Sequence, residues 1–336
     1  MLSSPGEWLP PYLAPFFSLS DRVEPPVAPD SFPDSTYYSA GPQDICFIIT
    51  CIAVMAVLRD ILRLNVFEPF ADWKLTNNLH EKRSAGKDMN GDAKSTNGHH
   101  ANGNGNGVSK KELRHIHRSV LRFAEQGWSA VYYPIQFCFG LYVNYNLPTE
   151  LFNNSLLWAN YPHVYLAAPV KLYYLTQTAF YSHQILILNA EAPRKDHYQM
   201  MAHHIISVIL MGTSYYCNFT RVGCFIMVLM DCCDIFLPIA KMMRYIEASR
   251  SVCDSLFAFF VVSWFITRHV IFIPILISVW REVPKLVERE YFWLFFGSLT
   301  ALQIIQLIWF GTICRVVWKV VTTSEGASDV RSDEEG

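Results

Sequence analysis

The stretch "MMAHHIISVILMGTSYYCNFTRVGCFIMVLMDCCDIFLPIAK", residues 200–241, decides how the rest of the chain is interpreted. It holds two apolar runs, 200–218 and 222–240, each close to the roughly 20 residues that cross a bilayer as a helix. Four ionisable side chains interrupt these runs: His203, His204, Asp231 and Asp234. An aspartate at the bilayer centre costs roughly 2.5–3.5 kcal/mol, so such groups predict a functional polar site inside a membrane bundle.

Apolar runs of this kind recur along the 336 residues, of which 51% are hydrophobic and 15% aromatic. Charged residues gather in short segments between the runs, which excludes an ordinary soluble two-domain chain. We therefore predict an all-α polytopic integral membrane protein. About seven transmembrane helices are expected, at 44–58, 128–145, 164–188, 200–218, 222–240, 256–280 and 291–318.

Net charge and cysteine usage exclude other classes. The formal net charge is −2, so bulk attraction to nucleic acid is not expected. Nearly all of the nine cysteines fall in apolar runs, which favours small core residues over a disulfide framework. The lipid bilayer is the predicted surrounding, and nucleic acid is not a predicted partner.

The polar segments divide the chain. We predict an N-terminal segment at 1–42, a first span at 43–62 and a disordered Asn/Gly linker at 80–109, which contains "MNGDAKSTNGHHANGNGNG". Residues 110–128 carry a helical stripe of arginines, typical of an interfacial basic helix. Residues 321–336 form an acidic tail in which Ser332 is a candidate phosphorylation site.

Basic residues between the runs predict the orientation. They are dense after the first span and between the third and fourth and the fifth and sixth, whereas 146–163 has no Lys or Arg. The N-terminus is therefore expected in the lumen and the C-terminus in the cytosol, although the basic residues of 281–290 disagree with this orientation. The same orientation places the glycosylation sequon at Asn153 in the lumen.

Antiparallel pairing brings the imidazoles and carboxylates to similar depths. His203 and His204 lie about 5 Å below the predicted start of their span, while Asp234 and Asp231 lie about 9 Å and 14 Å from the end of theirs. The adjacent histidines point about 100° apart, so one of them is expected to face the carboxylates.

Other polar groups sit at membrane depth. A stripe follows one face of the third span and consists of Tyr173, Gln177, Tyr181 and Gln184. Arg268 and His269 lie in the middle of the sixth span, and Asp231 is the predicted partner of Arg268. Two interpretations stay open for these groups: substrate contacts, or helix-to-helix hydrogen bonds with a structural ion pair.

Two chemistries suit imidazole and carboxylate groups. Metal binding is disfavoured, since adjacent histidines rarely bind one ion and the chain contains no H-x-x-H box. In a His/Asp dyad the carboxylate orients the imidazole, which abstracts a proton or attacks a carbonyl. The residues alone therefore predict a membrane-embedded acid/base enzyme acting on lipid.

The stretch from His203 to Lys241 resembles the signature of ceramide synthases, the longevity-assurance branch of the TLC-domain proteins. The matching residues, besides the four ionisable ones, are Ser214, Tyr215, Asn218, Arg221, Gly223, Ala240 and Lys241. Flanking segments agree, among them "RFAEQGW" at 122–128 and "KLYYLTQTAFYSH" at 171–183. Ser207 stands where the pattern has Thr. The homeobox-like insert of many animal relatives is absent, which resembles the fungal type.

The resemblance implies a six-helix TLC catalytic domain, at 110–320, after one N-terminal span, in the endoplasmic reticulum membrane. It implies transfer of a fatty acyl group from acyl-CoA to a sphingoid base, with acyl-CoA as co-substrate and no permanently bound cofactor or metal. His203 or His204 is the implied catalytic imidazole, oriented by Asp231 and Asp234. The implied substrate-binding residues are Tyr173, Gln177, Tyr181, Ser214, Tyr215, Asn218, Arg221, Arg268, Arg194, Lys195 and Lys241; Arg194, Lys195, Lys241 and Arg244 would meet the CoA phosphates.

Relatives of this kind form homo- or heterodimers, and some fungal ones bind a small single-span accessory subunit. Acyl-chain length is linked in the family to the loop before the last span, here 281–290. Two rival functions remain: a non-catalytic TLC-domain lipid sensor or translocon-associated protein, and a metal-dependent membrane lipid hydrolase. Relatives without catalysis tend to lack the His pair and the D-x-x-D motif, both of which are present here.

Overall fold

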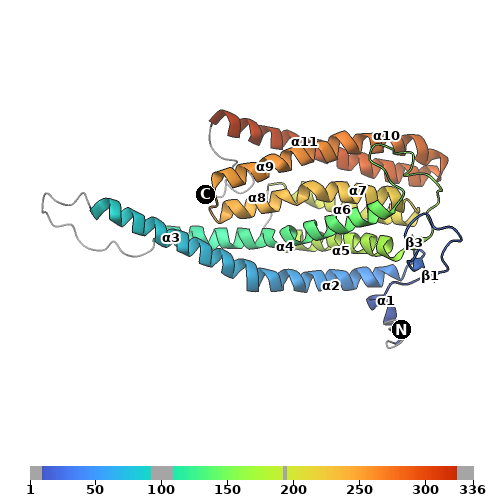
Figure 1. The fold of residues 1–336 in the computed structure, drawn as a ribbon, viewed down its shortest axis with the longest axis horizontal. Helices are drawn as coiled ribbons and strands as arrows, with labels where there is room; N and C mark the ends of the chain where they lie inside the picture. The colour runs from blue at the N-terminus through green and yellow to red at the C-terminus, as the bar shows by residue number, and fades with distance from the viewer. Residues whose placement is uncertain (1–9, 92–108, 192–194, 324–336) are drawn as a thin grey trace.

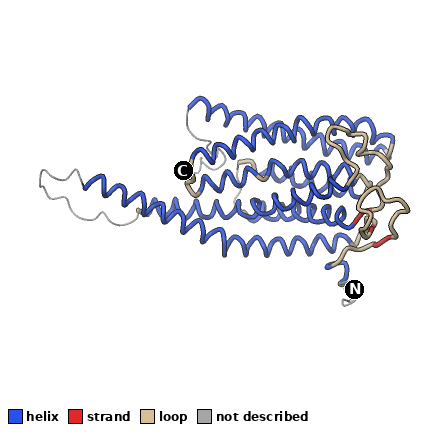
Figure 2. The backbone as a smooth tube through the Cα atoms, viewed as in Figure 1, coloured by secondary structure: helices blue, strands red, loops and turns tan. Residues whose placement is uncertain are grey.

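The computed structural model describes residues 10–91, 109–191 and 195–323, and it is a bundle of long helices that lie side by side (Figure 1). Loops and short strands gather at one end, where the turn between α6 and α7 lies; we call this the α6–α7 end (Figure 2). The opposite end holds the turn between α8 and α9 and is called the α8–α9 end. The predicted all-helical class is confirmed.

Every predicted span falls largely on helix, although several are longer or broken and the third begins with a short strand. In chain order the elements are α1 (Ala14–Phe17), β1 (Arg22–Val23), β2 (Tyr37–Tyr38), α2 (Asp44–Leu62), the π-helical turn η2 (Arg63–Phe67), α3 (Glu68–Gly91), α4 (Lys110–Asn146), β3 (Leu166–Ala167), α5 (Ala168–Ala190), α6 (His197–Tyr216), α7 (Thr220–Asp234), α8 (Phe236–Tyr245), α9 (Arg250–Phe265), the π-helical turn η3 (Ile266–Ile271), α10 (Phe272–Glu282), the 3₁₀ turn η4 (Val283–Lys285) and α11 (Arg289–Thr323).

Four helical segments of the described chain are long and apolar enough to cross a membrane. They are Asp44–Ser84, Thr220–Tyr245, Arg250–Lys285 and Arg289–Thr322. The other three predicted spans fall on α4, α5 and α6, which run alongside them (Figure 1). These three helices are more polar because they carry buried polar side chains, including Gln136, Gln177 and the histidine pair. The protein is therefore a multi-pass membrane protein whose bundle has a polar interior.

The first span does not end at Arg59 and Asp60, as the sequence predicted. Helix continues through η2 into α3 and reaches Gly91, so the first part of the predicted linker is helical, and 92–108 lies outside the described residues. Charge alone does not stop a helix, and Arg59 is instead paired at 2.5 Å with Glu191, the residue that follows α5. The π-helical turn ends at Phe67, just ahead of Pro69, whose ring would clash with the carbonyl four residues earlier in a regular helix.

Prolines also divide the fifth and sixth spans. Pro238 has no N–H for the carbonyl of Asp234, and α7 ends at that residue. In the sixth span η3 lies just ahead of Pro274, as η2 lies ahead of Pro69. The two breaks place Asp234 at a helix end and Arg268 in a widened turn, and both residues are used in the site.

The α3–α4 pair extends beyond the other helices at the α8–α9 end (Figure 1). Ser109 begins α4 with a capping box, in which its side chain and that of Glu112 satisfy each other's backbone N–H groups. Leu75 of α3 and Phe123 of α4 belong to one apolar cluster with residues of α8. The predicted interfacial helix at 110–128 is thus continuous with the second span and packs against α3.

Gly223 of α7 allows close approach of α5. A Cβ atom at this position would lie 1.5 Å from Tyr174 Oη, which is within 2.9 Å of Ser214 Oγ on α6. We expect Gly223→Ala to destabilise the bundle by about 1–3 kcal/mol, since Tyr174 must leave its place. Thermal unfolding of the detergent-solubilised protein should show a lower midpoint, whereas Gly212→Ala, whose Cβ meets nothing within 4 Å, should leave it unchanged. Equal midpoints for both variants would contradict the packing described.

Candidate active site

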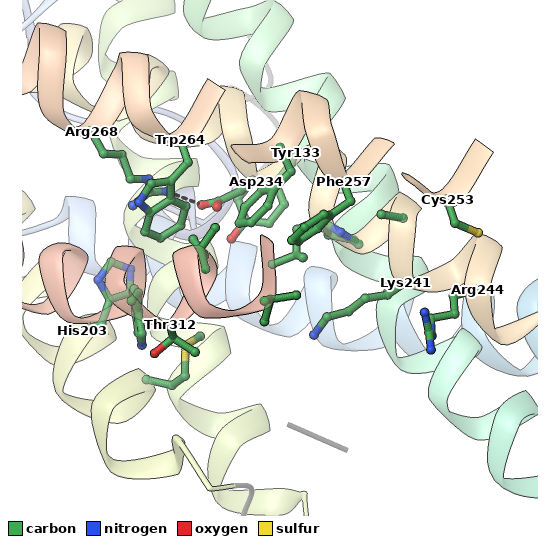
Figure 3. Close-up of a pocket in the computed structure, with 18 of the residues that line it drawn as sticks. Tyr133, His203, Asp234, Lys241, Arg244, Cys253, Phe257, Trp264, Arg268 and Thr312 are labelled. Atoms are coloured by element: carbon green, nitrogen blue, oxygen red, sulfur yellow. Dashed lines mark hydrogen bonds and ion pairs between the residues drawn. The ribbon is translucent and has the colours of Figure 1, made fainter. Parts of the chain in front are cut away.

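A cavity of about 230 Å³ lies between α6, α8, α9 and α11, with contributions from α4, α7 and η3. Its walls are mainly apolar and include Phe257, Phe260, Trp264, Trp309 and Ile313. Figure 3 shows His203 and Arg268 toward one end of the cavity and Lys241 and Arg244 toward the other. The cavity is therefore an apolar chamber with the imidazoles and Arg268 toward one end and two cations of α8, Lys241 and Arg244, toward the other.

The two predicted imidazoles both line this cavity and are almost completely buried. His203 is 8% exposed and His204 is 4% exposed, and their ring centroids are 5.2 Å apart. The ring of Tyr181 lies 6.1 Å from the first and 5.5 Å from the second, and Trp309 lies 5.3 Å from His203. Within the described residues neither Nδ1 atom has a hydrogen-bond partner. These buried imidazoles can therefore take up a proton or bond to a ligand.

Arg268 pairs with Asp234, and the predicted partner Asp231 was wrong. Its Nη2 lies 2.8 Å from Asp234 Oδ2 and 2.9 Å from the carbonyl oxygen of Met230, and its Nε donates to Cys233 Sγ at 3.0 Å. The ion pair crosses from η3 to the end of α7, as Figure 3 shows. Both residues line the cavity, so this pair is a charged wall close to the imidazoles.

Asp231 does not line the cavity. It is fully buried and accepts a hydrogen bond from Gln177 Nε2 at 2.7 Å, while Tyr132 Oη donates to Gln177 Oε1 at 2.8 Å. In the described part of the chain no hydrogen bond joins either imidazole to Asp231 or Asp234. The two carboxylates, expected to act together, therefore have different surroundings: one faces the cavity and the other is held behind it.

The polar stripe of α5 is divided among several contacts. Gln177 belongs to the Asp231 network, and Tyr181 packs against both imidazoles. Tyr173 packs edge-on against Phe139, and its buried hydroxyl has no hydrogen-bond partner among the described residues. Gln184 lies near the α8–α9 end and lines a second cavity, between α2, α4, α5, α6 and α8. Helix-to-helix bonding thus accounts for part of the stripe.

The residues expected to meet the CoA phosphates are only partly brought together. Lys241 and Arg244 of α8 line the cavity (Figure 3). Lys195 lies exposed in the turn before α6 and is not among the lining residues. Arg194 lies outside the described residues. Cations from α8 therefore remain the best-placed phosphate contacts.

Four further predicted substrate contacts lie away from the cavity, at the α6–α7 end, and make structural contacts. Arg221 pairs with Asp30 at 2.7 Å and donates to the carbonyls of Leu156 and Ala159. Tyr215 donates to Asp44 at 2.8 Å, a carboxylate that is also paired with Lys171 at 2.7 Å.

Ser214 and Asn218 complete this set. Ser214 bonds to Tyr174, and Asn218 adopts a positive φ of 58° in the short turn between α6 and α7. The contacts of Arg221 and Tyr215 hold the N-terminal segment and the 147–165 loop to the bundle, together with the small antiparallel sheet of β1, β2 and β3. None of these four predicted residues is among those that line the cavity, and their substrate contacts stay a prediction.

Sequence reasoning missed the aromatic and sulfur partners of Arg268. Its guanidinium carbon lies 4.3 Å from the ring centroid of Trp264, and Cys233 accepts from its Nε. The four-residue spacing of Trp264 and Arg268 was a usable signal, since residues four apart share a helix face. The contact between His269 and Gln303, at 3.0 Å, joins η3 to α11 and had no signal in the sequence.

Over residues 10–91, 109–191 and 195–323, no group of three or more His, Cys, Asp or Glu side chains could hold a metal ion. The rival metal-dependent hydrolase therefore has no ligand set in that part of the chain.

The bundle, with its cavity between α6 and α11, matches a known family of membrane proteins. Residues 122–315 match the TLC domain. The chain belongs to the TLC-domain family, in its sphingosine N-acyltransferase (ceramide synthase) branch, as the following relatives show.

The chain is 33% identical to the sphingosine N-acyltransferase lag1 of Schizosaccharomyces pombe, over 98% of this chain and 74% of the relative. It is 29% identical to the ceramide synthase FUM18 of Gibberella moniliformis, over 97% of this chain and 73% of the relative. It is 33% identical to ceramide synthase 4 of Mus musculus, over 64% of this chain and 54% of the relative. The predicted family is thus confirmed, and the two fungal relatives match almost the whole chain.

Proposed function

We propose that this protein is a ceramide synthase, an acyltransferase that joins the fatty acyl group of acyl-CoA to the amine of a sphingoid base such as sphinganine or phytosphingosine. The observation that carries the proposal is the pair of buried imidazoles in an apolar cavity with cations at one end. The fungal relatives named sphingosine N-acyltransferase and ceramide synthase, matched over nearly the whole chain, support it.

The cavity suits an acyl thioester as substrate. Its aromatic and aliphatic walls favour an acyl chain, since each buried CH₂ contributes about 0.8 kcal/mol. Lys241 and Arg244 are suitably charged for the phosphates of CoA. With the chain inside and the phosphates at the cationic end, the thioester carbonyl would lie toward His203 and His204. Acyl-CoA is then a co-substrate, and no permanently bound cofactor is required.

Two chemical routes use these imidazoles. In the first, the imidazole takes a proton from the amine as the amine attacks the thioester; in the second, it attacks the thioester and carries the acyl group. Asp234, which is paired with Arg268, is the carboxylate of the cavity wall, and Asp231, held by Gln177, lies behind that wall. Acyl-CoA supplied without amine separates the routes, because only the second leaves an acyl adduct on histidine, detectable by intact mass.

The proposed location is the endoplasmic reticulum membrane, with the N-terminus in the lumen and the C-terminus in the cytosol. The density of basic residues at the α8–α9 end supports this orientation, which opens the cavity toward cytosolic acyl-CoA. Dimerisation, a small single-span accessory subunit and control of acyl-chain length by 281–290 are proposals carried by the family resemblance.

The direct test is an assay of membranes containing the protein, with sphinganine and a panel of acyl-CoAs. We expect N-acyl product to form with a preferred chain length, and to require both substrates. A protein that is folded in these membranes but gives no product with any acyl-CoA and either base would contradict the proposed function.

A further inference from the structure

Tyr133 of α4 lines the cavity of about 230 Å³, although no role was predicted for it. The residue is 9% exposed, and its ring packs edge-on against Tyr132, with ring centroids 5.9 Å apart, and against Phe180, at 5.3 Å. Figure 3 shows Tyr133 next to Asp234. This packing holds the ring, so the phenolic hydroxyl has a defined place in the cavity wall.

The hydroxyl of Tyr133 faces the cavity. It makes no hydrogen bond to another described residue, and protein atoms do not enclose it as they enclose the unpartnered indole N–H of Trp264. The hydroxyl of a largely buried tyrosine usually has a hydrogen-bond partner. A free hydroxyl in an otherwise apolar wall therefore indicates that an acceptor atom of a ligand completes its bonding.

Other donors of the same wall are less suitable for a ligand. The indole N–H of Trp264 is buried, so a ligand in the cavity does not reach it. Three further side chains of the wall already donate to acceptors within the protein: Arg268, Trp309 and Thr312. Tyr133 is therefore the neutral donor best placed to bind a ligand.

We propose that Tyr133 is a further catalytic residue, whose hydroxyl donates to the carbonyl oxygen of the acyl thioester and to the oxyanion formed from it. This inference rests on the proposed function. The imidazoles come from α6 and the hydroxyl from α4, so the carbonyl carbon can meet a nitrogen while its oxygen meets the hydroxyl. A donor already in place stabilises the developing charge without reorganisation of solvent.

The chemistry is the same for either route through the imidazole. When a nitrogen bonds to the carbonyl carbon, an electron pair of the C=O bond moves to oxygen, and Tyr133 donates to that oxygen while keeping its proton. The pair then returns and the carbon–sulfur bond breaks. In either route the amine loses one proton and the CoA thiolate gains one, so the products are an amide and a free thiol.

Replacement of Tyr133 with phenylalanine removes only the hydroxyl and keeps the packed ring. We expect the kcat for N-acyl product formation to fall about a hundredfold, because one oxyanion donor is lost. The KM for acyl-CoA and the thermal midpoint should stay near the wild-type values. Tyr145→Phe is the matched control: Tyr145 lies on the same helix, is 89% exposed, does not line the cavity and should keep the full kcat.

Two unreactive CoA analogues separate a contact with the carbonyl from a structural role. The first is a ketone, in which CH₂ replaces the thioester sulfur, and the second is a thioether, in which CH₂ replaces the carbonyl. The wild type should bind the ketone about fivefold more tightly than the thioether. Tyr133→Phe should lose this preference and bind the thioether as the wild type does. A variant that keeps more than a third of the wild-type kcat, or that loses equal affinity for both analogues, would overturn the inference.

A third measurement needs no variant. With ¹³C at its carbonyl, the ketone analogue bound to the wild type should show a C=O stretching band at lower frequency than in an alkane, because a hydrogen bond weakens the C=O bond. An unshifted band would overturn the inference even if Tyr133→Phe did not fold. Failure of the proposed function looks different, since the wild type itself would then form no N-acyl product.

Discussion

Replacing His203 with glutamine should lower the rate of N-acyl product formation by about a thousandfold, while the protein remains folded. The imidazole is buried in the acyl cavity beside Tyr181 and Trp309, so glutamine can fill its space but cannot take up a proton or carry an acyl group. Loss of a general base or nucleophile costs about 10²–10⁴ in rate. The measurement is the initial rate with sphinganine and the preferred acyl-CoA, on protein whose amount and thermal stability match the wild type.

His115→Gln is the matched control for this substitution. His115 is exposed, near the start of α4, and should keep the full rate. If the His203 variant retained more than a tenth of the wild-type rate, His203 would not be the catalytic imidazole.

Arg268→Met should destabilise the protein by about 3–5 kcal/mol. Arg268 is 2% exposed, and its removal leaves the carboxylate of Asp234 without its ion-pair partner inside the bundle. The expected result is a large drop in the unfolding midpoint in detergent and poor recovery of folded protein. Arg268→Lys should be intermediate, because an ammonium keeps the charge but cannot reach Asp234, Met230 and Cys233 at once.

A double variant separates the ion pair from the general effect of altering a buried residue. Asp234→Leu combined with Arg268→Met removes both charges, and replacement of a buried pair by apolar groups is often neutral. We expect the double variant to unfold at a higher temperature than Arg268→Met alone, yet to lack activity because the charged wall of the cavity is gone. A double variant less stable than Arg268→Met would contradict the ion pair as described.

The helices were predictable from the sequence because length and apolar composition carry their signal. Each predicted span falls on helix. The ends were less predictable: Arg59 and Asp60 looked like a boundary, but Arg59 pairs with Glu191 at the end of α5 and the helix continues. Charge marks a helix end only when no other element supplies a partner.

The site was predictable as a set of residues, but not as a set of pairs. Asp231 and Asp234 are three residues apart on one face, so the spacing could not say which of them meets Arg268. Tertiary structure makes the choice, because Pro238 ends α7 at Asp234 and Pro274 follows the widened turn that carries Arg268. The prolines were visible in the sequence and were the missing signal.

Residues that are close together in the 200–241 stretch lie at opposite ends of the bundle. His203 and His204 lie in the first half of α6, near the α8–α9 end, whereas Ser214 and Tyr215 lie in its last turn and Asn218 lies in the turn that follows. At 1.5 Å per residue, ten residues separate two positions by roughly 15 Å. A contiguous motif therefore combines residues of the site with residues that hold the N-terminal segment.

The most direct test of the central claim is the site of covalent labelling by an acyl-CoA that carries bromine on the carbon next to the carbonyl. This reagent places an electrophile where the thioester reacts. Peptide mass spectrometry should find the label on His203 or His204, and unmodified acyl-CoA should prevent it. Label confined to residues outside the cavity, with the histidines unmodified and unmodified acyl-CoA still protecting, would contradict acyl transfer at this cavity.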